Sequence, residues 1–445
     1  GTGPGRKVIQ PRGYVLSGSS ALNAMVWVRG APAFYDKFWP DGWRWSDVAP
    51  YFAKAETYDH AGRGELRGAD GPTSCMSCEA AGLPRAHQLF VQASDALSRK
   101  SGDRPFTRSN PDYNDARNAL GVGAAQWNIK DGVRQSTDVS YLTPEVRRRK
   151  NLTVLGRAFV TKVELEGGRA VGVRFRRGAA NLNSGESERH RMTRLALCPE
   201  HSAGATAEVC LCGGAFQSPQ LLMVSGVGPR EELARHGIPQ VVDSPGVGEN
   251  LQDHLMTRLL FRIKDEKAFQ EQLETLAVGV DFGWSYGRSW IQGILFTCTD
   301  DSGVPDVQFM LCYNVWGGKL AEPLAMQMHF RAIGLTDLFW QERVPAASAK
   351  SKLCMLFPCL TQPKSKGRVR LNSGSALDYP ELDMNYLAEQ EDVDALVRAQ
   401  NLMRRIVATK PLKDVLGKEV VNQELPGWRD PASQEYNEAY ARSAA

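Results

Sequence analysis

The sequence predicts a mixed protein of the α/β or α+β class, and three observations support this prediction. Alternating β-rich residues on both sides of Gly167 and Gly168 predict a β-hairpin over residues 151–177. A short apolar run at 209–212, followed by two glycines and a helical pattern, predicts a buried strand that turns into a helix. An apolar stripe at helical spacing between residues 393 and 407 predicts an amphipathic helix packed against a sheet.

The remaining elements between the hairpin and the middle of the chain are predicted from local signals. Residues 178–207 are rich in polar and small residues, which predicts a mobile insertion after the hairpin. Ser218 is predicted to cap a helix that has Pro219 at its first position. A second short helix is expected over residues 229–236, ended by Gly237.

Length, composition and charge exclude several classes of protein. With 445 residues, the chain is long enough for two or three domains whose cores need no metal or disulfide. Its 54 basic and 50 acidic residues leave a net charge of +4, too small to indicate a nucleic-acid partner. No apolar run of about 18 residues is present, so no membrane-spanning segment is expected. The nine cysteines include one CxxC pair, Cys75 and Cys78, whereas a zinc ribbon needs two, so no metal site is expected.

Residues 11–30 carry the first candidate binding motif. Gly18 allows a close backbone approach, while Ser19 and Ser20 supply hydroxyl and amide groups at the start of an expected helix. Free amides at such a position attract a phosphate. Asn23 lies one helical turn after Ser19, so both side chains are expected to reach one ligand. Taken alone, this segment is explained equally well by a capped helix start.

The second candidate motif occupies residues 213–229. Gly213 and Gly214 follow the predicted strand and precede the predicted helix. A strand that ends in glycines and continues as a helix exposes backbone amides at the edge of the sheet where α/β proteins bind nucleotides. A tight strand–helix turn without a ligand is the alternative that this segment leaves open.

Together, the two motifs resemble the two sequence signatures of the glucose–methanol–choline (GMC) family of flavin oxidoreductases. Further segments resemble family segments in the same order, at residues 131–136, 151–155, 160–163, 245–254 and 367–387. The resemblance implies a Rossmann-like FAD-binding domain interleaved with a substrate domain built on an antiparallel sheet with helices. It also implies that a small-molecule alcohol is oxidised by hydride transfer to the flavin, with a histidine accepting the hydroxyl proton.

The resemblance assigns cofactor contacts residue by residue. The first motif would contribute to the pyrophosphate and isoalloxazine side of FAD with Gly18, Ser19, Ser20, Asn23, Ala24, Met25 and Val26. Val160 would contact the adenine through its backbone, and Gly213 and Gly214 would lie near the adenosine. Ser17 stands where the family usually has a glycine, which disfavours a positive φ there. Some members attach the flavin through a histidine at the position of Leu22, so FAD is predicted to bind non-covalently here.

The resemblance also implies that parts of the family's protein have no counterpart in this chain. Residues 1–57 and 150–262 are expected to form the FAD-binding part, and residues 58–149 and 263–445 the substrate part. The GxGxxG loop of a first βαβ unit and the motif with the catalytic histidine have no match in the sequence. We therefore assign no catalytic residue within this chain and expect a piece of a larger enzyme that is inactive alone.

The sequence leaves two other functions open. The family's fatty-acid photodecarboxylase branch uses an active-site cysteine and arginine, where this chain has Trp290 and Met310, with Cys298 as a displaced substitute. A degenerate homologue that binds without catalysis is the other alternative. Candidates for lining a substrate pocket are aromatic residues and one histidine: Trp284, Tyr286, Trp290, Phe309, Tyr313, Trp316 and His329.

Overall fold

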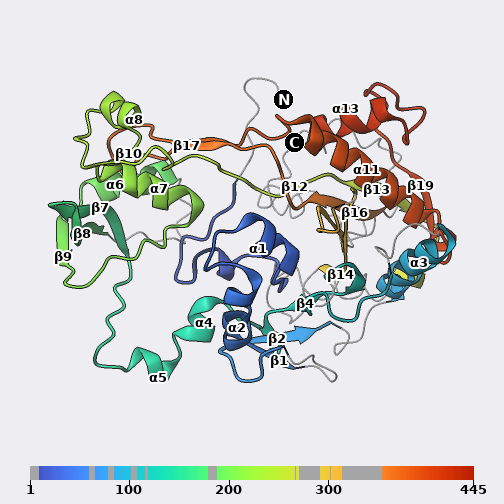
Figure 1. Cartoon of the computed structure of the whole chain (residues 1–445), viewed down its shortest axis with the longest axis horizontal. Coiled ribbons are helices and arrows are strands. Elements are labelled where there is room, and N and C mark those ends of the chain that lie inside the picture. Colours follow the sequence, from blue (N-terminus) through green and yellow to red (C-terminus); the bar gives the residue numbers. More distant parts are fainter. Residues whose placement is uncertain are drawn as a thin grey trace. The chain divides into compact units, whose positions relative to one another are not determined.

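The computed structural model of the protein describes residues 10–59, 66–78, 85–101, 108–115, 119–178, 188–265, 267–269, 291–300, 302–312 and 353–444. The chain forms two compact units, each built from separate stretches of sequence (Figure 1). The first unit contains Lys150–Asp253 and Pro363–Ala388. The second contains Thr2–Arg149, His254–Gln362 and Glu389–Ala445.

The first unit is built on an antiparallel sheet with the strand order β7-β8-β9. β7 (Ala158–Glu166) and β8 (Arg169–Arg177) form the predicted hairpin. Its turn residues, Gly167 and Gly168, have φ angles of 57° and 81°, as the twist of a two-residue hairpin turn requires. β9 (Glu200–Gly204) pairs with β8. The hairpin prediction is therefore confirmed.

The other elements of this unit are short: α6 (Glu188–Ala196), α7 (Gly214–Val224), β10 (Val227–Gly228), α8 (Arg230–Arg235), β11 (Val242–Asp243), β17 (Arg368–Arg370) and β18 (Glu381–Asp383). β10 pairs with β11 in parallel, and β17 pairs with β18 antiparallel. Their core is a cluster of buried apolar side chains: Phe216, Met223, Val224, Leu233, Leu251, Val369 and Leu371. α8 confirms the second short helix, which Gly237 follows with a φ of 66°.

One prediction about the stretch between β8 and α7 is wrong. Residues 209–212 form no strand, and both Cys210 and Cys212 are exposed. Among the described residues, no neighbouring strand offers the backbone partners that a buried strand needs. Within the segment 178–207, the structure describes α6 and β9, and β9 pairs with β8, while the mobility of this polar insertion stays a prediction.

The predicted start of α7 is also wrong. The helix begins at Gly214, four residues before the expected cap at Ser218. Gly214 has a φ of 78°, so the glycine itself makes the turn into the helix. Pro219 therefore lies inside the helix, where it removes one backbone hydrogen bond, rather than at its first position.

The second unit is built on a larger antiparallel sheet. Its strand order is β19-β13-β16-β15-β14-β3, and β12 pairs alongside β16. The strands are β3 (Gly121–Ala124), β12 (Leu255–Met256), β13 (Leu259–Ile263), β14 (Ile291–Thr297), β15 (Val307–Cys312), β16 (Leu353–Leu360) and β19 (Leu416–Glu419). A smaller sheet has the order β1-β2-β4, and a short ribbon joins β5 and β6. These strands are β1 (Glu56–Asp59), β2 (Thr73–Ser77), β4 (Gln126–Trp127), β5 (Ile129–Lys130) and β6 (Val133–Arg134).

Helices and turns surround these sheets in the second unit. They are η1 (Gly18–Ala21), α1 (Pro32–Phe38), α2 (Trp45–Ala55), α3 (Arg85–Ser101), α4 (Thr137–Tyr141), α5 (Pro144–Arg147), η3 (Lys267–Phe269), α11 (Gln390–Val407), α12 (Leu412–Val415) and α13 (Gln434–Ala444). α11 confirms the predicted amphipathic helix, because its apolar stripe is buried: Val393, Leu396, Val397, Met403, Ile406 and Val407. None of the described helices is both long and apolar enough to cross a lipid bilayer.

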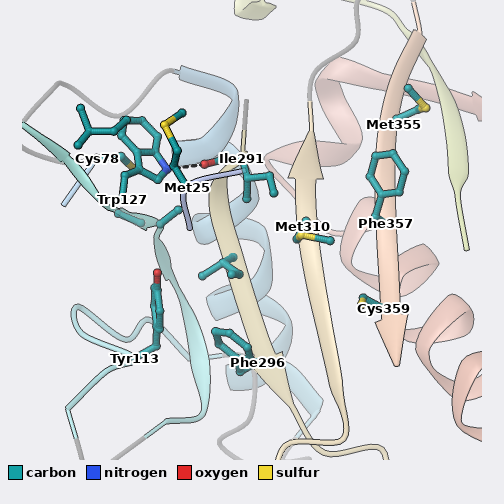
Figure 2. Packing of buried hydrophobic residues seen from close by; sticks show 14 of the residues in the cluster. Met25, Cys78, Tyr113, Trp127, Ile291, Phe296, Met310, Met355, Phe357 and Cys359 are labelled. Atoms are coloured by element: carbon teal, nitrogen blue, oxygen red, sulfur yellow. Dashed lines mark hydrogen bonds between the residues drawn. The ribbon is translucent and has the colours of Figure 1, made fainter. Parts of the chain in front are cut away.

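The core of the second unit includes a residue of the first motif. Figure 2 shows Met25 beside the indole of Trp127, whose Nε1 donates a hydrogen bond to the Ile291 carbonyl over 2.8 Å. Side chains of the large sheet, including Met310 and Phe357, belong to the same cluster. The first motif is therefore fixed to the interior of this unit.

The mixture of antiparallel sheets and helices confirms the predicted mixed class. The two units divide the chain differently from the predicted functional parts, because residues 2–57 belong to the second unit rather than to the unit with residues 150–253. Packing explains this, since Met25 is buried beside Trp127. The division into FAD-binding and substrate parts stays a prediction.

Candidate cofactor site

The first motif forms a tight turn instead of the predicted helix. η1 contains only four residues, Gly18–Ala21, and is of the 3₁₀ type. Ser17 and Gly18 have φ angles of 79° and 54°. Ser17 thus adopts the positive φ that its side chain was expected to disfavour. A left-handed conformation is less favourable by about 1–2 kcal/mol for a residue other than glycine, so neighbouring groups must compensate.

Hydrogen bonds to Asp138 stabilise Ser17 in this conformation. Ser17 Oγ donates to the Asp138 carboxylate, and the Asp138 backbone N–H donates to Ser17 Oγ over 3.1 Å. Ser136 Oγ donates to the same carboxylate over 2.6 Å. The hydrogen bonds from Ser136 and Ser17 lower the pKa of Asp138 below its ordinary value. Asp138 is consequently ionised at neutral pH and fixes the turn as a charged acceptor.

Neighbours of Asp138 hold Ser20 in the same way. The Thr137 N–H donates to Ser20 Oγ over 3.1 Å, and Ser20 Oγ donates to the Ser17 carbonyl over 2.9 Å. Arg134 Nη1 donates to the Ser20 carbonyl over 3.0 Å. Residues 134–138, from the end of β6 to the start of α4, therefore support the turn from a distant part of the sequence. We call them the support segment.

The exposed surface of the turn offers hydrogen-bond donors. Ser19 and Asn23 are exposed, and the Ser19 N–H donates no hydrogen bond within the described residues. Ser19 Oγ accepts the Gly13 N–H over 3.2 Å, which leaves its hydroxyl hydrogen for a ligand. Arg134 adds a positive charge beside these groups. Donors of this kind match phosphate oxygens and flavin carbonyls, so the turn fits the part of FAD that the resemblance assigns to it.

The residues after the turn are fixed in the core. Met25 has a φ of 60°, and its side chain is only 2% exposed. Its carbonyl accepts the Asn128 N–H over 2.9 Å. Ala24 and Val26 pack against the same core cluster. The structure thus brings the seven predicted residues of the first motif into one rigidly supported loop.

A buried charge network fixes the chain just beyond this loop. Glu56 is fully buried and accepts hydrogen bonds from Trp27 Nε1 over 2.7 Å and from Arg29 Nη2 over 2.5 Å. It also accepts from Arg67 Nε over 2.7 Å. Arg67 Nη1 donates to both carboxylate oxygens of Asp112 over 2.8 Å. The positive charges of two guanidinium groups are balanced by the negative charges of two carboxylates. Removing one of these four charged groups would leave an uncompensated charge in the interior.

In the first unit, the second motif builds its turn from its own glycines. Gly213 precedes α7, and Gly214 begins the helix at a φ of 78°. Gly213, at the N-cap position, has no side chain with which to cap this helix. Amides at the start of a helix attract electronegative groups. The turn therefore fits an oxygen of the adenosine part of FAD, as the resemblance predicts for both glycines.

Val160 lies on the strand that packs beside this helix. Val163 N–H donates to Ser225 Oγ over 2.8 Å, which ties β7 to the end of α7. The pairing of β7 with β8 shifts register between Val160 and Lys162, so the strand bulges there. The bulge leaves Thr161 out of the ladder, while Val160 stays paired with Phe175, so the backbone contact of Val160 with adenine stays a prediction. The sequence gives no signal for this bulge.

Other candidate groups lie in packed interiors or outside the described residues. Burial lowers the pKa of the fully buried His87 to about 3, so this imidazole stays neutral. Met310 and Cys298 are both buried, and Trp290 lies outside the described residues. Of the proposed pocket residues, only Phe309 is described, and it is buried inside the large sheet. No group of His, Cys, Asp and Glu in the described part of the chain is arranged to hold a metal ion.

Sequence profiles of a known family match most of the chain. The N-terminal GMC oxidoreductase profile matches residues 1–256, and the C-terminal profile matches residues 363–445. The chain belongs to the GMC oxidoreductase family. FAD, the predicted cofactor, is the cofactor of this family, and the predicted family resemblance is confirmed.

Curated relatives include choline dehydrogenases. The chain is 31% identical over 429 residues to mitochondrial choline dehydrogenase of Mus musculus, covering 93% of this chain and 62% of that protein. It is 31% identical over 421 residues to oxygen-dependent choline dehydrogenase of Staphylococcus aureus strain JH9, covering 94% of this chain and 65% of that protein. The chain therefore spans somewhat less than two thirds of the length of these relatives.

Solved structures share the fold. Pyridoxine 4-oxidase from Mesorbium loti aligns with a TM-score of 0.74 and 25% identity, covering 99% of this chain and 73% of that one. A formate oxidase aligns with a TM-score of 0.72 and 21% identity, covering 97% and 73%. The mixed α/β fold is thus that of GMC flavoproteins.

Sequence reasoning missed the groups that support the first motif. Arg134 lies within a segment that resembles the family and Asp138 follows that segment, yet nothing in their spacing indicates that Arg134 contacts Ser20 or that Asp138 contacts Ser17. Glu56 reads in sequence as an ordinary charged residue at the end of a helix. A fully buried carboxylate is recognisable only when its two guanidinium partners are seen around it.

Proposed function

We propose that this GMC protein is an FAD-dependent oxidoreductase that oxidises a small-molecule alcohol. The observation that carries this proposal is the donor-rich turn of the first motif, which the resemblance to the family predicts to contact FAD. When bound, FAD supplies the hydride acceptor for the CH–OH carbon of the alcohol. The relatives named choline dehydrogenase and pyridoxine 4-oxidase support an alcohol as the substrate class.

The chain's own residues bind and orient the cofactor. Ser19 and Asn23 present donors from a turn whose backbone is held by the support segment. Gly213 and Gly214 present amides at the start of α7. The buried network around Glu56 keeps the loop from shifting, because its charges are stable only together. Catalysis depends on such fixed positioning, because small displacements of the reacting groups slow the reaction steeply.

We also propose that FAD is held non-covalently. Leu22 occupies the position at which some family members have the histidine that attaches the flavin. An aliphatic side chain forms no such bond. The expectation that the chain alone is inactive stays a prediction, and we assign no catalytic residue within it.

Protein produced from the complete coding sequence tests these proposals. We expect a flavin absorbance spectrum, loss of the oxidised flavin band when choline, pyridoxine or another primary alcohol is added anaerobically, and flavin in the supernatant after acid precipitation. A folded protein without flavin would contradict the proposed function and favour a degenerate homologue. Hydrocarbon release from a fatty acid under illumination, with no reduction by alcohols, would favour a photodecarboxylase.

A further inference from the structure

Within the described residues, the carboxamide of Asn23 is hydrogen-bonded through its oxygen and not through its nitrogen. Its Oδ1 accepts the Met25 backbone N–H over 3.1 Å and a hydrogen bond from Arg134 Nη1 over 2.7 Å. Both partners are obligate donors, so the oxygen of the amide must be the atom that faces them. A carbonyl oxygen has two lone pairs, and both are now used.

The nitrogen of the same amide is consequently directed away from these partners. Asn23 Nδ2 donates no hydrogen bond within the described residues, and the side chain is exposed. An asparagine can in general present either its oxygen or its NH₂ group to a ligand by rotating half a turn. That rotation is excluded here, because it would place the NH₂ group against two donors. Asn23 is therefore fixed as a hydrogen-bond donor.

Arg134 is well placed to impose this orientation. Its Nη1 also donates to the Ser20 carbonyl over 3.0 Å, so the guanidinium spans the two ends of the turn. Its backbone is fixed by pairing with Ile129 in the β5–β6 ribbon. Burial lowers the pKa of Arg134, but a guanidinium remains charged throughout the working pH range. The hydrogen bond to Asn23 is therefore charge-assisted.

We propose that Arg134 is a positioning residue that fixes the Asn23 amide so that its NH₂ group donates to an oxygen of FAD. The proposal rests on the proposed function, because the resemblance places Asn23 against the cofactor. It adds a residue 111 positions away to the site and states which hydrogen-bonding group Asn23 uses. An acceptor at position 23 would not replace it.

A double-mutant cycle on FAD affinity tests this positioning role. The protein is stripped of flavin, and FAD is titrated into the wild type, Arg134→Met, Asn23→Ala and the double variant, with flavin fluorescence as the readout. Each single variant is expected to bind FAD roughly tenfold more weakly. The double variant should lose less affinity than the two single losses combined, because Arg134 acts in part through Asn23.

Matched variants separate positioning from general stability. Arg147→Met removes an exposed arginine that, like Arg134, donates to a backbone carbonyl, that of Leu142, and should leave FAD affinity unchanged. Arg134→Lys keeps one charged donor and should recover part of the affinity. Asn23→Asp keeps a partner for Arg134 but replaces the NH₂ donor by an acceptor, so it should bind FAD at least as weakly as Asn23→Ala while the melting temperature of the flavin-free protein is maintained.

Each outcome of these titrations decides a separate question. Additive losses in the double variant, or an Asn23→Asp protein that binds FAD like the wild type, would overturn the positioning role. If Arg134→Met fails to fold, the Asn23→Asp titration alone still decides whether a donor is required. Failure of the wild type to bind FAD would instead contradict the proposed function.

Discussion

Both motifs expose hydrogen-bond donors, but their left-handed backbone positions differ: the first motif has non-glycine residues there, and the second has a glycine. The loop at residues 17–26 places two non-glycine residues, Ser17 and Met25, at positive φ angles of 79° and 60°. It depends on hydrogen bonds from a segment 111–121 positions away. The turn at Gly213 and Gly214 uses glycine for its one left-handed position.

Substitutions should therefore act differently in the two motifs. A left-handed turn position occupied by glycine is sensitive to replacement of the glycine itself. A turn built from serine, methionine and asparagine fails when any of its distant partners is changed. The first motif is therefore expected to be sensitive to residues that no local sequence pattern connects to it.

Among these substitutions, Glu56→Gln is expected to lower the free energy of unfolding most. The substitution leaves Arg29 and Arg67 buried with one counter-charge fewer, which should lower the free energy of unfolding of the second unit by about 3–5 kcal/mol. Urea unfolding followed by tryptophan fluorescence measures it. Glu145→Gln, which breaks an exposed pair with Arg148, should leave stability nearly unchanged. Equal effects of the two substitutions would show that the buried network does not stabilise the loop.

Ser17→Ala should give the next largest effect. It removes the hydrogen bonds with Asp138 but keeps a side chain at positive φ, so it should lower stability by about 1.5–3 kcal/mol. Ser17→Gly loses the same bonds but relieves the backbone, and should be more stable than Ser17→Ala by about 1–2 kcal/mol. Thermal melts of both variants measure the difference. The reverse order would mean that strain at Ser17 is negligible.

Gly214→Ala should act on the other motif with a smaller effect. A Cβ at a φ of 78° is expected to lower the stability of the first unit by about 1–2 kcal/mol. Gly156→Ala is the matched control in the same unit, since a Cβ there meets no atom within 4 Å and its φ is not left-handed. The control should be neutral or slightly stabilising. Similar losses in both variants would refute the role assigned to the glycine turn.

The smallest expected effect is on the pH dependence of stability, to which the Asp138 carboxylate contributes. Its pKa is lower in the folded protein than in the unfolded chain, so its contribution to stability is complete above the ordinary aspartate pKa of about 4 and is lost as the pH falls further. Asp138→Asn should flatten the acid limb of a plot of melting temperature against pH. An unchanged acid limb would indicate that Ser17 and Ser136 do not stabilise the carboxylate.

Local signals were sufficient for some elements and insufficient for others. The hairpin and α11 were predictable because a Gly-Gly turn and an apolar stripe are encoded in neighbouring residues. Residues 209–212 form no strand although their apolar run favours one, because such a run does not reveal whether a neighbouring strand is present to pair with it. Pro219 lies inside α7 rather than at its first position, because the helix begins at Gly214.

The candidate site shows the same division. The glycines of the second motif predict its turn into a helix, whereas the first motif forms a 3₁₀ turn where its sequence predicts a helix. The support of the first motif has no local signal, because Arg134 and Asp138 lie 111–121 positions away from the residues that they contact. The positive φ at Ser17 was missed for the same reason: local sterics disfavour it, and the compensating carboxylate comes from far along the chain.

The central claim is that each motif contributes to FAD binding, and FAD titration of one variant in each motif tests it most directly. Asn23→Ala changes the loop of the second unit, and Gly214→Ala changes the glycine turn of the first. We expect each flavin-free variant to bind FAD more weakly than the wild type. Wild-type affinity in either variant would contradict the claim.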